Sequence, residues 1–298
     1  MYFEDETTEP FQIVMKTSFS SEDEQTYSTP DQIPLHIKEC EFYRLFNKKA
    51  PIPMPKVYFI QKPNVEQKLP SFIFMENLSK KGIVLDYDAY IREEQVLAVV
   101  ENIAKLHAYM LSIDEEEWRG SFVLRESLVI GGLLREWIEN GAKLRPGFLD
   151  PLIAKLSKFI DDPEGRNYAK SGCCKDLGNP TFDIARHLVL CVEGTLRREI
   201  EQYIIEFYYQ KLQKYCTISS KLESFSIENL KKAYAYALAR QAVINVSYIE
   251  MREDPGPNAS LEKQEAYKAL IDRMMQNAKW ALEDAVVGLE KLDPKWLS

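Results

Sequence analysis

Short apolar segments separated by polar residues predict a small sheet near the start of the chain. Residues 11–16 read Phe-Gln-Ile-Val-Met-Lys, an apolar run that ends in a basic residue and predicts a strand. Residues 52–60 enter a second apolar run through two prolines, and residues 69–78 form a third that ends in Met-Glu-Asn-Leu. Residues 17–34 are polar and rich in Ser, Thr, Glu and Asp, so we expect a loop after the first strand.

Helical periodicity dominates most of the remaining chain. Apolar side chains recur at 37, 40, 42, 43 and 46, which predicts a helix over 36–46. Apolar positions at 96, 97, 100, 103, 104 and 106 predict a core-facing helix over 93–109. Residues 126–160 suggest further helices, and two long ones are predicted over 227–250 and 261–292, with a turn at 254–258. The pattern alone indicates an α+β or α/β protein with a helical C-terminal half.

Composition and charge narrow the classes of partner. The chain has 298 residues, enough for one large domain or two lobes, and its 45% hydrophobic and 28% charged content suits a folded protein. Its net charge of -8 argues against nucleic-acid binding, which needs a basic surface, and against an anionic membrane surface. No apolar run approaches a membrane span, and the acidic N-terminus lacks the apolar segment of a signal peptide. We therefore expect a cytoplasmic location.

Cysteine and histidine spacing indicates neither a metal site nor a disulfide framework. The five cysteines, at 40, 173, 174, 191 and 216, are odd in number and irregularly spaced, which favours reduced thiols. The three histidines, at 36, 107 and 187, include no pair at i, i+4 and no cluster with metal-ligand spacing. The aromatic and Met stripes of 227–292 favour core positions over a ligand site.

The most informative stretch, residues 176–186, reads Asp-Leu-Gly-Asn-Pro-Thr-Phe-Asp-Ile-Ala-Arg. Gly178 and Pro180 interrupt regular structure, and Asp183 precedes Arg186 by three residues on an expected helix. A buried Asp and Arg at this spacing can form a charge-assisted pair that ties a loop to a helix start.

This stretch and three others resemble the CHK-type, ecdysteroid-kinase-like proteins, which are relatives of choline kinases and aminoglycoside phosphotransferases. The resemblance covers residues 11 to about 292, and its most specific motifs are Ile37–Phe46, Met75–Leu78, Ile103–Ala108 and Gly178–Arg198. It implies an α+β, two-lobed protein-kinase-like fold. The small lobe, residues 1–78, lacks the glycine-rich phosphate loop and is expected to be N-terminally truncated, whereas the large lobe, residues 79–298, is mainly helical.

The resemblance implies a nucleotide site built from the small lobe. Lys16 corresponds to the strand lysine that forms ion pairs with the nucleotide phosphates in the family. Glu39 corresponds to the helix glutamate that forms an ion pair with this lysine. The hinge, whose backbone hydrogen-bonds adenine, corresponds to Met75, Glu76, Asn77 and Leu78. The implied cofactors are ATP and Mg²⁺, and the implied substrate is a small hydroxylated molecule. From the residues alone, Lys16 and Glu39 could equally be solvated charges on an edge strand and a helix face.

Structural roles are implied by the same resemblance for residues of the large lobe. His107 is expected to be a packed histidine beneath the site rather than a catalytic base. The resemblance implies structural rather than catalytic roles also for Gly178, Pro180, Asp183 and Arg186.

The catalytic segment of the family is absent from this sequence. Near residues 168–178 the chain lacks the His-Gly-Asp motif, whose Asp orients the acceptor hydroxyl, and it lacks the Asn and the Asp-(Trp/Phe)-Gln that hold magnesium. Asp176-Leu-Gly178 resembles the Asp-Phe-Gly of protein kinases, but Gly178 belongs to the Gly-x-Pro motif, so Asp176 is out of register. We therefore expect no catalytic residue and no metal ligand.

Three interpretations stay open. The first is an ATP-dependent alcohol phosphotransferase, and the second is a non-catalytic pseudokinase that serves as a binding or scaffold module. The third is a spliced or incomplete product of an active kinase, which the loss of one contiguous block between intact motifs fits best. The absence of the catalytic segment is expected to leave apolar surface exposed near residues 165–180, including Cys173 and Cys174.

Overall fold

A computed structural model describes residues 12–18, 32–62, 71–83, 90–118, 130–161, 179–223 and 225–298. The chain divides into two compact units. The first comprises Met1–Val84 and Ile113–Leu128, and the second comprises Leu85–Ser112 and Val129–Ser298. Compared with the lobes expected over 1–78 and 79–298, the main difference is segment 113–128, which belongs with the first unit.

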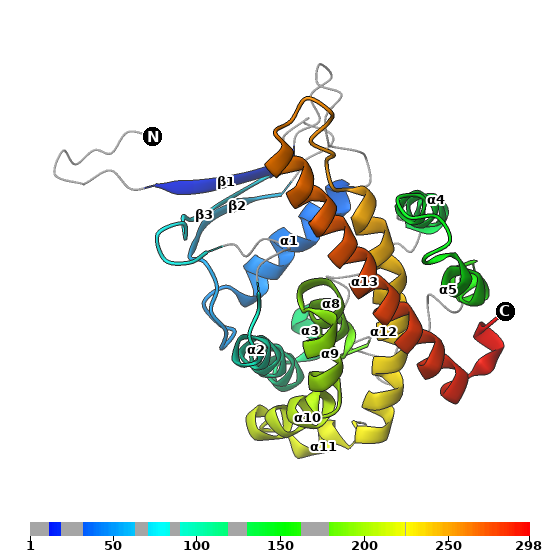
Figure 1. Ribbon diagram of the computed structural model, residues 1–298. Coiled ribbons are helices and arrows are strands. Elements are labelled where there is room, and N and C mark those ends of the chain that lie inside the picture. Colours follow the sequence, from blue (N-terminus) through cyan, green and yellow to red (C-terminus); the bar gives the residue numbers. More distant parts are fainter. Residues whose placement is uncertain are drawn as a thin grey trace. The chain divides into compact units, whose positions relative to one another are not determined.

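The first unit contains a three-stranded antiparallel sheet in the order β1-β3-β2. Its strands are β1 (Ile13–Ser18), β2 (Val57–Gln61) and β3 (Ser71–Glu76), so all three predicted strands are present. Helix α1 (Gln32–Phe46) contacts the sheet (Figure 1). The side chains of Cys40 and Phe46 on α1 are buried, as is Ile73 of β3. A short helix, α3 (Glu115–Trp118), comes later in the chain.

The second unit is built from helices among its described residues. Its longest members are α2 (Glu93–Ser112), α4 (Ile130–Lys143), α10 (Ile204–Tyr215), α12 (Ile227–Glu250) and α13 (Leu261–Leu292). Shorter helices are α5 (Asp150–Lys155), α6 (Ser157–Asp161), α8 (Phe182–Cys191), α9 (Gly194–Glu201), α11 (Ser219–Leu222) and the 3-10 helix η1 (Pro294–Trp296).

Helix α12 is the centre of this unit. It packs against α4, α8, α10 and α13, and most of its length is buried (Figure 1). A helix surrounded on several sides needs apolar residues around most of its circumference, in agreement with the buried residues found along the whole of α12. The same packing buries the polar residues Arg240, Gln241 and Asn245.

The predicted ends of the two long helices are confirmed. The Ser226 hydroxyl accepts a hydrogen bond from the Asn229 amide at 3.1 Å, and the Ser260 hydroxyl accepts one from Lys263 at 3.4 Å, so a serine caps each N-terminus. Between the helices Gly256 has φ of +77°, a conformation that glycine adopts readily, and it marks the predicted turn.

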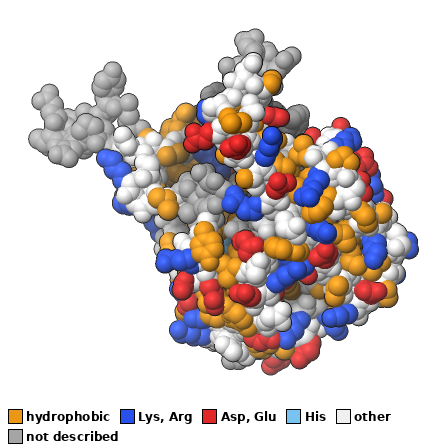
Figure 2. All heavy atoms as spheres, in the orientation of Figure 1, with side chains coloured by type: hydrophobic (Ala, Val, Ile, Leu, Met, Phe, Trp, Pro, Cys, Tyr) orange, Lys and Arg blue, Asp and Glu red, His pale blue; other side chains and the backbone are white. Residues whose placement is uncertain are grey.

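Charged side chains of both signs are mixed over the face drawn in Figure 2, interspersed with apolar ones. Among the described residues, none of the helices is both long enough and apolar enough to cross a lipid bilayer.

Candidate functional site

Lys16 and Glu39 form the ion pair that the order strand, polar loop, helix predicted. The Lys16 ammonium on β1 lies 2.8 Å from Glu39 Oε1 and 2.6 Å from Oε2 on α1. The side chain of Lys16 remains 52% exposed and that of Glu39 27% exposed, so the ammonium is held in position while solvent or a ligand can still reach it. A positioned lysine of this kind is suited to contacting phosphate oxygens.

His36, one turn before Glu39, lies at the same place and was not expected there. Its Nδ1 is 3.9 Å from Glu39 Oε2, and its side chain is buried with Nε2 lacking a hydrogen-bond partner among the described residues. Burial lowers the pKa of the His36 imidazole, an effect that Glu39 opposes and Lys16 reinforces. A mainly neutral imidazole at neutral pH therefore adjoins the ion pair.

The expected hinge begins at the end of the central strand. Glu76 ends β3, where its carboxylate forms an ion pair with Lys81 and accepts a hydrogen bond from the Lys56 amide at 3.2 Å. The Asn77 side chain accepts from the Ser79 amide at 2.9 Å and donates to Gln12 at 3.2 Å. The Leu78 carbonyl accepts from Lys81 and Gly82, at 2.8 and 2.9 Å. In the part of the chain that is described, the backbone groups of Asn77 have no backbone partner and can bond a ligand.

His107 is packed, as predicted. Its Nδ1 lies 2.8 Å from the hydroxyl of Tyr208, and the two rings meet edge to face. Burial lowers the pKa of the His107 imidazole, and the carboxylate of Asp183 acts in the opposite direction. This contact joins α2 to α10 inside the second unit.

The expected pair of Asp183 and Arg186 is wrong. Both side chains are exposed on α8, and no ion pair joins them. Arg186 instead donates to the hydroxyl of Tyr248 at 3.0 Å. The buried face of α8 is taken by Ile184, Ala185, Leu188 and Val189, which leaves positions 183 and 186 on the outer face.

Asn179 ties down the start of α8 in place of that pair. Its side-chain oxygen accepts from the Thr181 amide at 2.9 Å and from the Thr181 hydroxyl at 2.7 Å, while its amide nitrogen donates to the Ala233 carbonyl at 2.9 Å. Asn179, Pro180 and Thr181 are all buried. The remaining members of the expected motif, Asp176 and Gly178, lie outside the described residues, as do Cys173 and Cys174.

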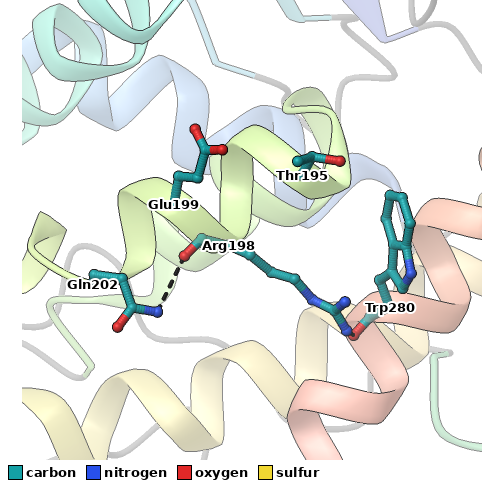
Figure 3. A pocket seen from close by; sticks show the side chains of 5 residues that line it. All are labelled: Thr195, Arg198, Glu199, Gln202 and Trp280. Atoms are coloured by element: carbon teal, nitrogen blue, oxygen red, sulfur yellow. Dashed lines mark hydrogen bonds between the residues drawn. The ribbon is translucent and has the colours of Figure 1, made fainter.

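An open pocket of about 470 Å³ lies between α9 and α13 (Figure 3). It is lined by Thr195, Arg198, Glu199, Gln202 and Trp280. The Arg198 guanidinium donates to Asp284 at 2.9 and 3.0 Å, to Glu283 at 3.1 Å and to the Trp280 carbonyl at 3.2 Å. These bonds engage Nε and Nη2 of the guanidinium and hold Arg198 against α13, where it forms one wall of the pocket. Trp280, which the sequence pattern predicts to be a core residue, lines this pocket instead.

The described ranges contain no group of three His, Cys, Asp or Glu side chains arranged to hold a metal ion. Cys40, Cys191 and Cys216 are free thiols.

Comparison with known proteins gives one family. The model of family DUF1679, described as "Uncharacterized oxidoreductase dhs-27", matches residues 11–128 and 174–289. The matched ranges contain Lys16, Glu39, the hinge, His107 and all of α8 and α12. No curated protein and no solved structure matches the chain. Because the matched ranges cover more than half of its length, the chain belongs to the DUF1679 family.

Proposed function

We propose that this chain is a relative of ATP-dependent small-molecule phosphotransferases with a two-lobed kinase-like fold. In this proposal the first unit keeps part of a nucleotide site, and the chain lacks the groups that transfer the phosphoryl group. It acts as a nucleotide-binding protein without useful catalytic turnover.

The ion pair of Lys16 and Glu39 is the observation that carries the proposal. An exposed strand lysine has little reason to be fixed by a glutamate 23 positions away, because an isolated surface ion pair contributes only about 0–1 kcal/mol to stability. Fixing the ammonium is useful if it must contact a phosphate. Because the side chain is already ordered before the ligand binds, binding does not have to meet the entropy cost of ordering it. The Glu39 carboxylate keeps the ammonium in place, and the exposed half of Lys16 faces the ligand.

The backbone after β3 supports the adenine end of the same proposal. The free backbone groups of Asn77 offer a donor and an acceptor, which is the pair that the edge of an adenine ring requires. ATP bound there would supply a triphosphate for Lys16 to contact.

The interruption of the family match supports the loss of catalysis. Residues 129–173 lie between the two matched ranges. The His-Gly-Asp motif is expected near residues 168–178, where this unmatched segment ends. Phosphoryl transfer depends on positioning and charge neutralisation, so a chain without the orienting Asp and the metal ligands loses most of its rate.

An oxidoreductase is the alternative that the family description raises. The sequence contains no G-x-G-x-x-G dinucleotide fingerprint, and the described strands form an antiparallel sheet rather than the parallel sheet of a dinucleotide-binding fold. These observations favour ATP over a nicotinamide dinucleotide as the ligand.

Equilibrium binding of a fluorescent ATP analogue tests the proposal, with unlabelled ATP and NADH as competitors. We expect displacement by ATP, and a loss of affinity of about tenfold or more in Lys16→Met, which removes a phosphate contact. Lys62→Met is the matched control, because Lys62 also pairs with a glutamate of α1, Glu41, but the resemblance gives it no ligand role.

Two results would overturn the proposal. Competition by NADH but not by ATP would favour the oxidoreductase interpretation. Equal affinity of the wild-type chain, Lys16→Met and Lys62→Met would remove Lys16 from the nucleotide site.

A further inference from the structure

A second cavity, of about 110 Å³, lies in the second unit where α8 ends and α9 begins. A single water molecule needs roughly 10–15 Å³ of such space, so the cavity can hold a group of several heavy atoms. Helices α12 and α13 complete its wall. The polar residues that line it are Cys191, Glu193, Asn245, Arg273 and Asn277, with Tyr90 beside them.

Asn245 of α12 presents a polar side chain to the cavity. The residue is only 8% exposed, and its amide forms no hydrogen bond within the described part of the chain. Its oxygen and nitrogen are not among the fully enclosed atoms without a partner, so they face the cavity and can bond a ligand there. A primary amide offers two donors and an acceptor, so it can serve a ligand that carries both kinds of group.

Donors gather on the α13 side of the cavity. The Arg273 guanidinium is exposed and forms no ion pair with any described residue. The Asn277 side-chain oxygen accepts from the Gly194 amide at 3.0 Å, which fixes the orientation of that amide group and leaves its nitrogen to donate. An unpaired guanidinium beside an amide N–H is suited to a carboxylate.

Acceptors gather on the opposite side, at the C-terminus of α8. The Leu188 carbonyl accepts from the Val192 amide at 3.3 Å, whereas no backbone amide in the described ranges bonds the carbonyls of residues 189–191. These residues line the cavity. Unpaired carbonyls and the negative end of the helix dipole favour a cation. The Glu193 carboxylate, which caps α9 through the Thr195 and Leu196 amides, adds negative charge nearby.

We propose that this cavity binds the head group of a free α-amino acid. The carboxylate of the ligand meets Arg273 and Asn277, and its ammonium meets the end of α8 and Glu193. The Asn245 amide lies in the buried wall, where its oxygen serves the ammonium and its N–H serves the carboxylate. The proposal is independent of the nucleotide site, because all of these residues belong to the second unit.

Isothermal titration of the full chain with glycine is the direct test. Acetate carries only the carboxylate and methylammonium only the cation, so both are expected to bind at least tenfold more weakly than glycine. Arg273→Gln is expected to weaken glycine binding by about tenfold or more. Lys268→Gln removes the same charge from an exposed site on α13 outside the cavity and is expected to leave binding unchanged.

Asn245→Leu separates a binding role from a structural one. It is expected to abolish glycine binding and to leave the melting temperature of the unliganded chain nearly unchanged, because the amide has no hydrogen bond to a described residue that could be lost. A lower melting temperature together with retained binding would overturn the proposal. So would glycine that fails to bind at millimolar concentration, or acetate that binds as tightly as glycine.

Discussion

Arg197 holds a buried positive charge whose partners all come from its own unit. Its side chain is 2% exposed, and its guanidinium donates to both oxygens of Glu201 at 2.8 Å and to Asp284 at 2.5 Å. The Tyr234 hydroxyl also donates to Glu201, at 2.7 Å. The network joins α9 to α12 and α13, and Glu201 depends on the Arg197 guanidinium to compensate its charge.

Replacing Arg197 by Met is therefore expected to destabilise the chain by about 3–5 kcal/mol, because it leaves the Glu201 carboxylate, which is only 13% exposed, without a counter-charge. Asp284 keeps its ion pair with Arg198. Arg198→Met is the matched control, since Arg198 shares Asp284 but is about one-third exposed, and its loss is expected to cost about 1 kcal/mol. Urea unfolding of both variants measures the difference. Equal losses would mean that burial does not set the strength of this network.

Single residues were the least predictable part of the site. The pairing of Lys16 with Glu39 was expected, because a strand, a polar loop and a helix follow one another in the order that the family resemblance implies. It misjudged Asp183 and Arg186, since a spacing of three fixes a shared helix face without saying whether that face is buried. Asn179 does what was expected of that pair, and its position two residues before Thr181 was the available signal.

Between elements, a polar cluster fastens α2 to α10. The Glu101 carboxylate accepts hydrogen bonds from the Tyr215 hydroxyl and, at 2.9 Å, from the Lys211 ammonium. The hydrogen bond from Tyr215 has the larger effect and that from Lys211 the next, and together they lower the pKa of Glu101 from 4.5 to about 2. Burial has a smaller effect in the opposite direction.

This shift makes the link between α2 and α10 pH-dependent. Because the folded pKa lies below the unfolded one, the stabilisation is complete above about pH 5 and is lost as the pH falls toward 2. The difference in unfolding free energy between the wild-type chain and Glu101→Gln should therefore be largest near neutral pH and shrink across this window. Glu94→Gln, an exposed change on the same helix, is expected to show no such trend. A pH-independent difference for Glu101→Gln would contradict the assignment.

Two glycines test how closely α4 and α13 approach α12. A Cβ at Gly141 of α4 would lie 2.4 Å from the Val246 carbonyl oxygen, whereas one at Gly288 of α13 would meet the Ala235 methyl group at 3.7 Å, an ordinary contact. Gly141→Ala is expected to destabilise the chain by about 1–3 kcal/mol because backbone must move. Gly288→Ala is expected to stabilise it by roughly 0.5–1 kcal/mol through helix propensity. Thermal unfolding decides both, and a stabilising Gly141→Ala would show that the two helices can separate freely.

Most elements were predictable because their signals are local. The ranges 227–250 and 261–292 were matched at both ends, since a serine N-cap and a Pro-Gly turn mark them. The first helix begins at Gln32 rather than near residue 36, because no apolar repeat marks its first turn. The strand order β1-β3-β2 depends on pairings between distant residues, which no local pattern encodes.

At the scale of the whole molecule, the family match and the division into units concern different parts of the chain. The unmatched residues 129–173 all fall in the second unit, whereas the proposed nucleotide site lies in the first, which the matched ranges include apart from its N-terminal residues. In the proposed function, the retained nucleotide site and the lost catalytic segment therefore belong to different parts of the chain.

This separation predicts that the chain does not phosphorylate a small alcohol at a useful rate. Transfer needs a group within hydrogen-bond distance of the acceptor oxygen, and magnesium needs oxygen ligands beside the phosphates. The carboxylates that remain along the Gly-x-Pro stretch are Asp176 and Asp183. Because Asp183 is exposed and not paired with Arg186, it joins Asp176 as a candidate. Two carboxylates still fall short of the orienting Asp, the Asn and the metal Asp that the reaction uses.

Incubation with labelled ATP, magnesium and a panel of alcohols, including choline and a steroid alcohol, measures this. We expect the wild-type chain, Asp176→Ala and Asp183→Ala to give the same background rate, while ATP binding through Lys16 persists in all three. Turnover that disappears in one variant but not in the other would identify that carboxylate as a recruited metal or acceptor group. Loss of turnover in Asp176→Ala would show that Asp176 is in register with the metal ligand after all, and loss in Asp183→Ala would give Asp183 a catalytic role. In either case the chain would be a catalyst that has rebuilt its site from the residues on either side of the lost segment.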